Sequence, residues 1–145
     1  MDALIYWIGF SLVKGIGSVR LQALLDYFGS LEVAWQAPAD ALRSAGMSQK
    51  IVQTMTQVRH SVDLPRYLES IQKKGIDILT WEDANYPRRL KEIDQPPPVL
   101  YVRGTLGPED GVAVAIVGTR RASVYGRQVA EELAAYLTRN GVTVV

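Results

Sequence analysis

The chain of 145 residues contains no cysteine, which excludes a disulfide scaffold, thiolate zinc sites, iron–sulfur clusters and a cysteine nucleophile. His60 is the only histidine, so catalytic or metal-binding arrangements that need two histidines are excluded as well. Sixteen basic residues nearly balance fifteen acidic ones, and the formal net charge is +1. Because this charge gives no global field to steer a nucleic acid, any such site must come from local grouping of basic residues.

Long apolar runs are also missing, since no segment approaches 18 uninterrupted apolar residues, and we expect no membrane span. The apolar run 3–13 lacks a basic leader and a cleavage site, so it is interpreted as a core helix and the protein is expected to be cytoplasmic. Apolar residues make up 48% of the chain and charged residues 21%, as in globular proteins. No motif for a cofactor is present.

The first half of the chain has the periodicity of short helices. Apolar residues recur at three- and four-residue spacing in four stretches: 21–28, 41–45, 51–58 and 64–71. Pro65 suits the first turn of the last helix, and the Lys74–Gly75 step is a typical helix end. These patterns predict a helical domain over residues 1–75.

Beyond Gly75 the pattern changes to strands, predicted at 76–80, 99–102, 112–117 and 142–145, with an amphipathic helix between the last two. Strand 112–117 is almost wholly apolar, so we expect it to be buried on both faces of a parallel sheet. Proline-rich residues 81–98 form a long connection, with one helical turn at 86–90. The sequence therefore predicts an α/β fold, with residues 76–145 forming a parallel-sheet domain that needs further strands and is apparently truncated.

The first candidate site is the segment 12–21, in which Gly15 and Gly17 separate two apolar helical stripes. Such glycines allow a tight reversal and a close approach of backbone N–H groups to a phosphate. Lys14 and Arg20 flank this turn, so we predict a helix-hairpin-helix that contacts DNA through them. A plain connecting turn is the alternative, and a poorer copy at 42–52 is interpreted as structural.

The second candidate site follows strand 112–117 and opens the amphipathic helix. A strand-to-helix junction carries free N–H groups and the positive end of the helix dipole, which favour a phosphate. Gly118 allows a close backbone approach, and Thr119 and Ser123 offer hydroxyl groups. The segment lacks the G-x-G-x-x-G pattern, so it is not a dinucleotide fingerprint.

Three arginines strengthen this second site. Arg120, Arg121 and Arg127 stand there with no acidic residue between Asp110 and Glu131. The planar guanidinium group matches phosphate because it bonds two oxygens at once, and Tyr125 offers a ring for base stacking. A turn with solvated arginines is the alternative interpretation.

Other conspicuous residues are interpreted as structural. The pair Glu82–Asp83 stands among turn-forming residues without a nucleophile or metal cluster, and His60 lies at a helix end. Trp7, Trp35 and Trp81 are scattered between predicted elements, which favours packing over a stacking platform.

Several stretches, in this order, give the chain a resemblance to the DNA-processing protein A family, also called DprA or Smf. They are residues 14–17 (KGIG), 86–90 (YPRRL), 97–104 (PPVLYVRG) and 116–126 (IVGTRRASVYG), and only Val124 departs from the proline common in the family. The resemblance implies a sterile-alpha-motif-like helical domain followed by the start of a Rossmann-like domain. The arginine of the family's Gly-Ser/Thr-Arg motif, which lines a basic pocket for single-stranded DNA, corresponds to Arg120.

The resemblance further implies a non-enzymatic protein that protects single-stranded DNA and loads the RecA recombinase on it during natural transformation, as a homodimer at full length. One alternative is a nucleotide-processing Rossmann-like enzyme, although such enzymes need an acid near the phosphate turn. The other is a duplex or junction binder that works through the hairpin at Lys14 and Arg20.

Overall fold

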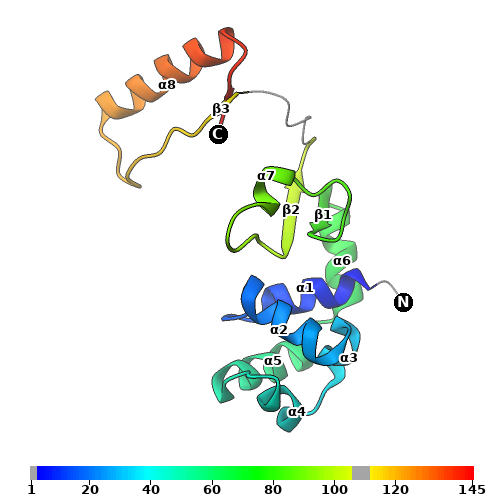
Figure 1. Cartoon of the computed structure of the whole chain (residues 1–145). Helices are drawn as coiled ribbons and strands as arrows, with labels where there is room; N and C mark the ends of the chain where they lie inside the picture. The colour runs from blue at the N-terminus through cyan, green and yellow to red at the C-terminus, as the bar shows by residue number, and fades with distance from the viewer. Residues whose placement is uncertain (1–2, 106–111) are drawn as a thin grey trace. The chain divides into compact units, whose positions relative to one another are not determined.

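The computed structural model describes residues 3–105 and 112–145, so Asp110 lies outside the described residues. The chain divides into two compact units, Met1–Leu106 and Gly107–Val145 (Figure 1).

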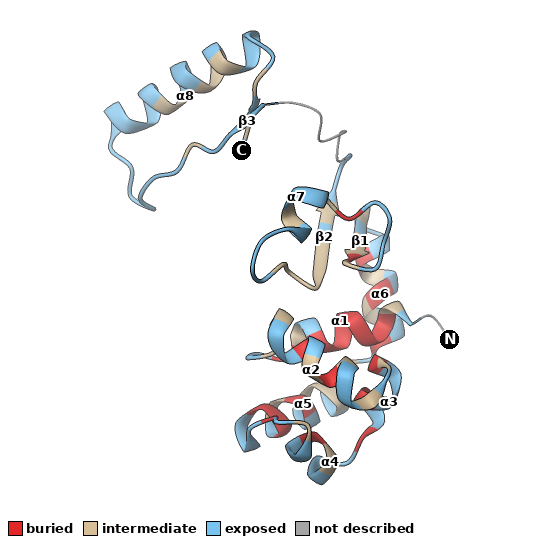
Figure 2. Ribbon diagram, viewed as in Figure 1, coloured by how far each residue is buried: buried red, intermediate tan, exposed pale blue. Residues whose placement is uncertain are grey.

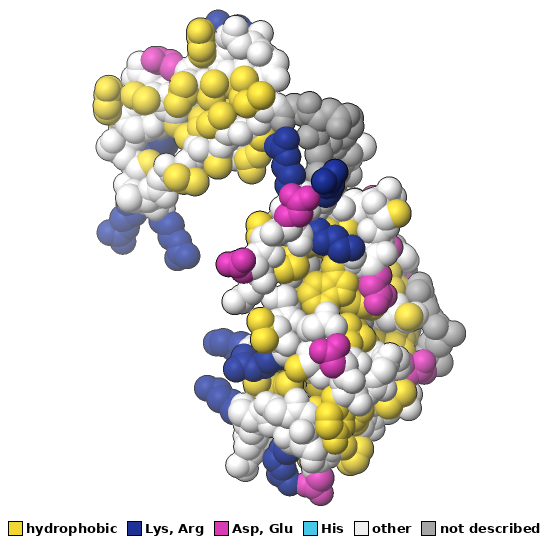
Figure 3. All heavy atoms as spheres, viewed as in Figure 1, with side chains coloured by type: hydrophobic (Ala, Val, Ile, Leu, Met, Phe, Trp, Pro, Cys, Tyr) yellow, Lys and Arg dark blue, Asp and Glu magenta, His cyan; other side chains and the backbone are white. Residues whose placement is uncertain are grey.

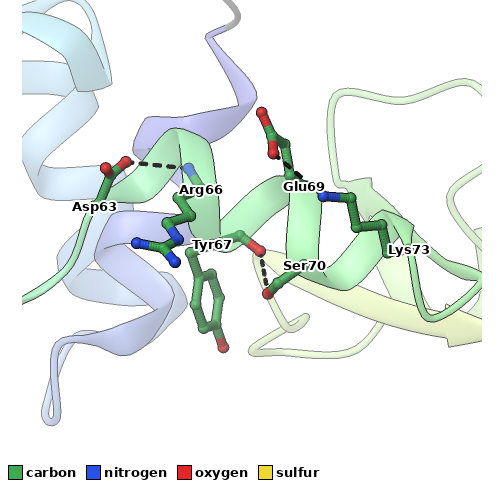
Figure 4. A network of polar contacts seen from close by, with 6 residues as sticks. All are labelled: Asp63, Arg66, Tyr67, Glu69, Ser70 and Lys73. Carbon is green, nitrogen blue, oxygen red and sulfur yellow. Dashed lines mark hydrogen bonds and ion pairs between the residues drawn. The ribbon is translucent and has the colours of Figure 1, made fainter.

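Six helices open the first unit, and their positions confirm the helical periodicity of the first half of the chain. They are α1 (Leu4–Leu12), α2 (Ser18–Phe28), α3 (Leu31–Gln36), α4 (Ala39–Ser44), α5 (Gln49–Ser61) and α6 (Leu64–Gln72). Serine or aspartate side chains cap α3, α5 and α6, where each accepts a hydrogen bond from a first-turn N–H group. Figure 4 shows the cap of α6, at which Asp63 accepts from the N–H of Arg66 at 3.1 Å.

Helix α1 is the centre of this unit, because it contacts α3, α5 and α6. Its residues 5–10 are all buried, which gives the continuous red segment in Figure 2. The ring of Phe10 packs edge-on against Trp35 at 5.1 Å, and Trp7 packs in the same way against Trp81 at 5.5 Å. The tryptophans are therefore packing residues, as the sequence predicted.

A two-stranded antiparallel sheet completes the first unit. Strand β1 (Ile76–Thr80) pairs with β2 (Val99–Arg103), with Ile78 opposite Tyr101. Between them the single turn α7 (Arg88–Lys91) starts after Pro87, as predicted for 86–90. The connection is fixed by internal hydrogen bonds, among them Tyr86 Oη to the carbonyl of Pro97 at 2.8 Å.

This sheet packs against the helices, and it is separate from the sheet of the second unit. Ile78 and Val99 pack against the helical core, and the hydroxyls of Ser11 and Tyr101 lie 2.8 Å apart. For this reason the first compact unit extends past residue 75, to Leu106. The boundary between independently folding domains at residue 75 stays a prediction.

The second unit is one strand–helix–strand arrangement. Helix α8 (Val124–Arg139) connects β3 (Ala113–Val114) to β4 (Thr143–Val144), and the two strands pair in parallel with Ala113 opposite Thr143. The chain is thus a mixed α/β protein, as predicted. The prediction that strands 76–80 and 99–102 belong to a parallel sheet is wrong for this structure, because these strands pair antiparallel with each other in the first unit.

The predicted burial of strand 112–117 is wrong for this structure. Only Ala113 and Val114 form strand β3, and Val117 is 87% exposed. One helix and one partner strand of two residues cannot cover both faces of an apolar segment. As a result Val112, Val145 and the apolar side of α8 at Leu133 are also exposed.

Candidate nucleic-acid interface

The loop between β3 and α8 leads directly into a helix whose start is well defined. Ser123 is the N-cap residue, and its Oγ accepts a hydrogen bond from the N–H of Gly126 at 3.0 Å. The first turn of this 16-residue helix contains no acidic side chain. The positive end of the helix dipole is therefore not neutralised by the helix itself.

The backbone N–H groups of this loop are available to a ligand. Within the described part of the second unit, none of the N–H groups from Gly118 to Ser123 donates a hydrogen bond. The N–H groups of Val124 and Tyr125, in the first helical turn, are equally without an acceptor. This is the set of unpaired donors that a helix start offers to an anion.

The three arginines of the site are exposed and unengaged. Across residues 3–105 and 112–145, no ion pair or hydrogen bond holds the guanidinium group of Arg120, Arg121 or Arg127. In Figure 3, dark-blue side chains project away from the loop end of this unit. The guanidinium groups are thus not neutralised by carboxylates, which favours the binding of an external anion.

The hydroxyl and aromatic groups of the site have different surroundings. Thr119 is exposed, and Tyr125 is 77% exposed. The oxygen of Ser123 is engaged as the helix cap, so this residue positions the helix start in addition to any contact with a ligand. The cap could have been recognised in the sequence, because serine before a helix is a typical N-cap.

The hairpin residues Lys14 and Arg20 lie in the first unit. The segment 13–17 joins α1 to α2, and Gly15 has a φ of +100°, which favours glycine. Arg20 donates from Nη1 to the carbonyl of Gly15 at 2.7 Å, so its guanidinium stabilises the turn itself. Lys14 is exposed and has no partner among the described residues, and Gly17 is the N-cap of α2.

The other polar groups that stand out have structural roles. The carboxylate of Asp83 accepts from the N–H of Thr80 at 2.6 Å and from its hydroxyl at 2.8 Å, which closes the turn after β1. Arg59 donates to the carbonyls of Ala34 and Ala37, and its burial lowers the pKa of its guanidinium. The turn contact of Asp83 agrees with its structural interpretation from the sequence. The role of Arg59 was missed, because it depends on contacts that only the folded chain creates.

Two kinds of feature are absent from the residues that the structure describes. No group of three histidine, aspartate or glutamate side chains is placed to hold a metal ion there. Among the same residues, no helix combines the length and the apolar character that crossing a membrane requires.

The fold and the loop define an α/β protein with a basic strand-to-helix turn of the kind that binds anionic groups. Comparison with known proteins makes this assignment specific. Residues 77–145 match the family model described as DNA recombination-mediator protein A. The chain belongs to the DNA-processing protein A family, also called DprA or Smf.

Three relatives illustrate the similarity. Protein Smf of Synechocystis sp. is 37% identical over 97% of this chain and 36% of its own length. DNA processing protein DprA of Bacillus subtilis is 32% identical over 73% of this chain and 34% of its own length. A putative DNA processing protein DprA of Mycobacterium tuberculosis is 29% identical over 96% of this chain and 38% of its own. The chain therefore spans about a third of the length of these curated relatives.

Proposed function

We propose that the chain is part of a protein that binds single-stranded DNA and delivers it to the RecA recombinase in natural transformation and recombination. In this proposal residues 1–75 form a helical domain of the sterile-alpha-motif type, and residues 76–145 begin a Rossmann-like domain. The full-length protein would act in the cytoplasm as a homodimer. The family membership supports this role, since the relatives are named DNA processing proteins and the family model a recombination mediator.

The observation that carries the proposal is the anion seat, by which we mean the loop 118–123 with the first turn of α8. The N–H groups from Gly118 to Tyr125 and the guanidinium groups of Arg120 and Arg121 have no partner within residues 112–145. Phosphates would accept from the loop amides and from both arginines, and Arg127 would add attraction along the first helical turn. Phosphate contacts carry no base information, so binding should tolerate any sequence.

The proposed activity is binding without catalysis. The enzyme alternative, a nucleotide-processing Rossmann-like protein, needs an acidic group near the phosphate turn. Glu131 lies in α8 more than one helical turn beyond the loop, and the first turn of α8 has no acid. A mononucleotide that raises the melting temperature of the chain, without any affinity for oligonucleotides, would support the enzyme and contradict the proposal.

The experiment measures fluorescence anisotropy of labelled oligo-dT and of a duplex of equal length with wild type, Arg120→Ala and Arg139→Ala. Arg139 is the matched control, because it is an exposed arginine in the last turn of the same helix, far from the seat. We expect preference for the single strand and a loss of about 1–3 kcal/mol for Arg120→Ala, as for a charge-assisted contact. Arg139→Ala should bind almost as wild type.

Three results would contradict the proposal. They are absence of oligo-dT binding by the wild type, equal binding by Arg120→Ala, and equal losses in the two arginine variants. Preference for the duplex, lost in Lys14→Ala and kept in Arg120→Ala, would instead support binding through the hairpin.

A further inference from the structure

We propose that a pocket in the first unit, named the base pocket here, takes one unpaired nucleobase of a bound strand. The pocket has a volume of about 310 Å³ and lies among α1, the α1–α2 turn, α6 and β2. This volume is at the lower end of the range of roughly 300–1,000 Å³ for small-molecule sites. The choice of a nucleobase as the ligand rests on the proposed function.

Four aromatic side chains line the base pocket, and two of them are fixed by ring contacts. Trp7 and Phe10 of α1 line it and are almost wholly buried. Each is fixed by an edge-on neighbour, Trp81 at 5.5 Å and Trp35 at 5.1 Å. Tyr67 and Tyr101 also line the pocket and are more exposed, so a ring that enters would contact these two tyrosine side chains.

The pocket also presents hydroxyl groups that have spare hydrogen-bonding capacity. The proton of the Ser11 hydroxyl is donated to the carbonyl of Ile8 at 2.7 Å, so Tyr101 is the donor in the 2.8 Å bond to Ser11 Oγ. The lone pairs of the Tyr101 oxygen therefore remain free to accept.

Tyr67 adds a second polar group to the pocket. Its backbone carbonyl accepts from Ser70 at 2.7 Å, while its ring projects away from α6 (Figure 4). Its hydroxyl has no hydrogen-bond partner among the described residues, and it can both donate and accept. Together, Tyr67 and Tyr101 match the donor and acceptor edge of a nucleobase.

The charges around the pocket favour a neutral ring beside a phosphate backbone. None of the residues that line it is charged. Ile16 lines the pocket and stands two residues after Lys14 of the hairpin turn. Lys14 is exposed and has no partner among the described residues. A base can enter the neutral pocket while a neighbouring phosphate lies toward this lysine.

The test titrates the chain with thymidine and with deoxyadenosine, and records ¹⁵N–¹H NMR spectra. Nucleosides carry no phosphate, so they do not report on the anion seat, and Arg120→Ala should leave their binding unchanged. We expect saturable shifts at Ser11, Ile16, Tyr101 and the indole N–H of Trp7. Tyr67→Phe, which keeps the ring and removes the free hydroxyl, should weaken nucleoside binding about two- to tenfold.

Tyr27→Phe is the matched control, because Tyr27 is an exposed tyrosine of α2 that does not line the pocket. The proposal is overturned if nucleosides cause no saturable shifts, if the shifts lie outside the pocket, or if Tyr27→Phe weakens binding as much as Tyr67→Phe. It is also overturned if N-acetyl-tyrosinamide binds as tightly as the nucleosides, since the pocket would then be a site for a protein side chain.

Discussion

Replacement of Gly9 by alanine tests how tightly α1 is packed into the core. A Cβ atom at this position would lie 2.9 Å from both Cη2 and Cζ3 of Trp35 and 3.0 Å from Cδ1 of Leu64. The indole has little room to move, because Phe10 packs on it edge-on at 5.1 Å and the guanidinium carbon of Arg59 lies 5.6 Å from its ring.

Two opposing effects decide the outcome. Alanine in a helix interior is favoured over glycine by about 1 kcal/mol, whereas overpacking a close-packed core costs about 1–3 kcal/mol. Because the new methyl group would lie 2.9 Å from a fixed ring, we expect an overpacking cost in the upper part of that range. We therefore expect Gly9→Ala to lower the free energy of unfolding by about 1–2 kcal/mol instead of raising it.

Urea unfolding followed by circular dichroism measures this change. The Trp35→Phe background provides the control, because phenylalanine lacks the two ring carbons that the new methyl group would meet. In that background Gly9→Ala should lower the free energy of unfolding by at least about 1 kcal/mol less than it does in the wild type. A difference of this size is a coupling energy typical of residues in contact. A more stable Gly9→Ala protein, or an equal loss in both backgrounds, would refute the packing argument.

Three further predictions concern other parts of the chain. Burial raises the pKa of Tyr86 above its ordinary value. The stability that the neutral tyrosine contributes is therefore complete below about pH 10 and is lost as the pH rises through the pKa of the folded state. In a profile of unfolding free energy against pH, Tyr86→Phe should flatten the alkaline limb. Arg59→Met removes two hydrogen bonds to carbonyls around the end of α3, and it should lower the free energy of unfolding in urea by about 2 kcal/mol. The control Arg66→Met removes a guanidinium group without a partner among the described residues, and it should change the same free energy by less than about 0.5 kcal/mol. Ser123→Ala should destabilise the start of α8 by about 1 kcal/mol, which should appear as faster amide exchange in the first turn of α8. Unchanged exchange in this variant would contradict the capping role. Ser123→Asp should keep the cap and weaken oligo-dT binding through its negative charge.

Elements with strong local signals could be predicted from the sequence. Strand 76–80 and the turn at Pro87 match the structure, because β-branched residues and proline restrict the backbone locally. The pairing of β1 with β2, and the packing of β1 on α6 and of β2 on α1, could not be predicted. A pairing across the connection 81–98 depends on tertiary contacts that leave no periodic pattern in the sequence.

In the candidate site, too, features with a local sequence signal could be predicted and features that depend on tertiary contacts could not. The position of the loop between a strand and a helix, with Arg120 and Arg121 in it, follows from local patterns. The apolar run 112–117 predicted burial, yet burial requires partner elements on both faces, and the described residues do not supply them. The bond from Arg20 to Gly15 was also missed, because a basic residue beside a turn gives no indication of where its guanidinium points.

The anion seat is tested most directly by the salt dependence of oligo-dT affinity in wild type and in the double variant Arg120→Gln/Arg121→Gln. Each phosphate contact on a single strand contributes about −0.7 to the slope of the logarithm of affinity against the logarithm of salt concentration. Loss of two contacts should make the slope shallower by about 1.4. Parallel lines for the two proteins would show that these arginines do not neutralise phosphates, and would contradict the proposed function.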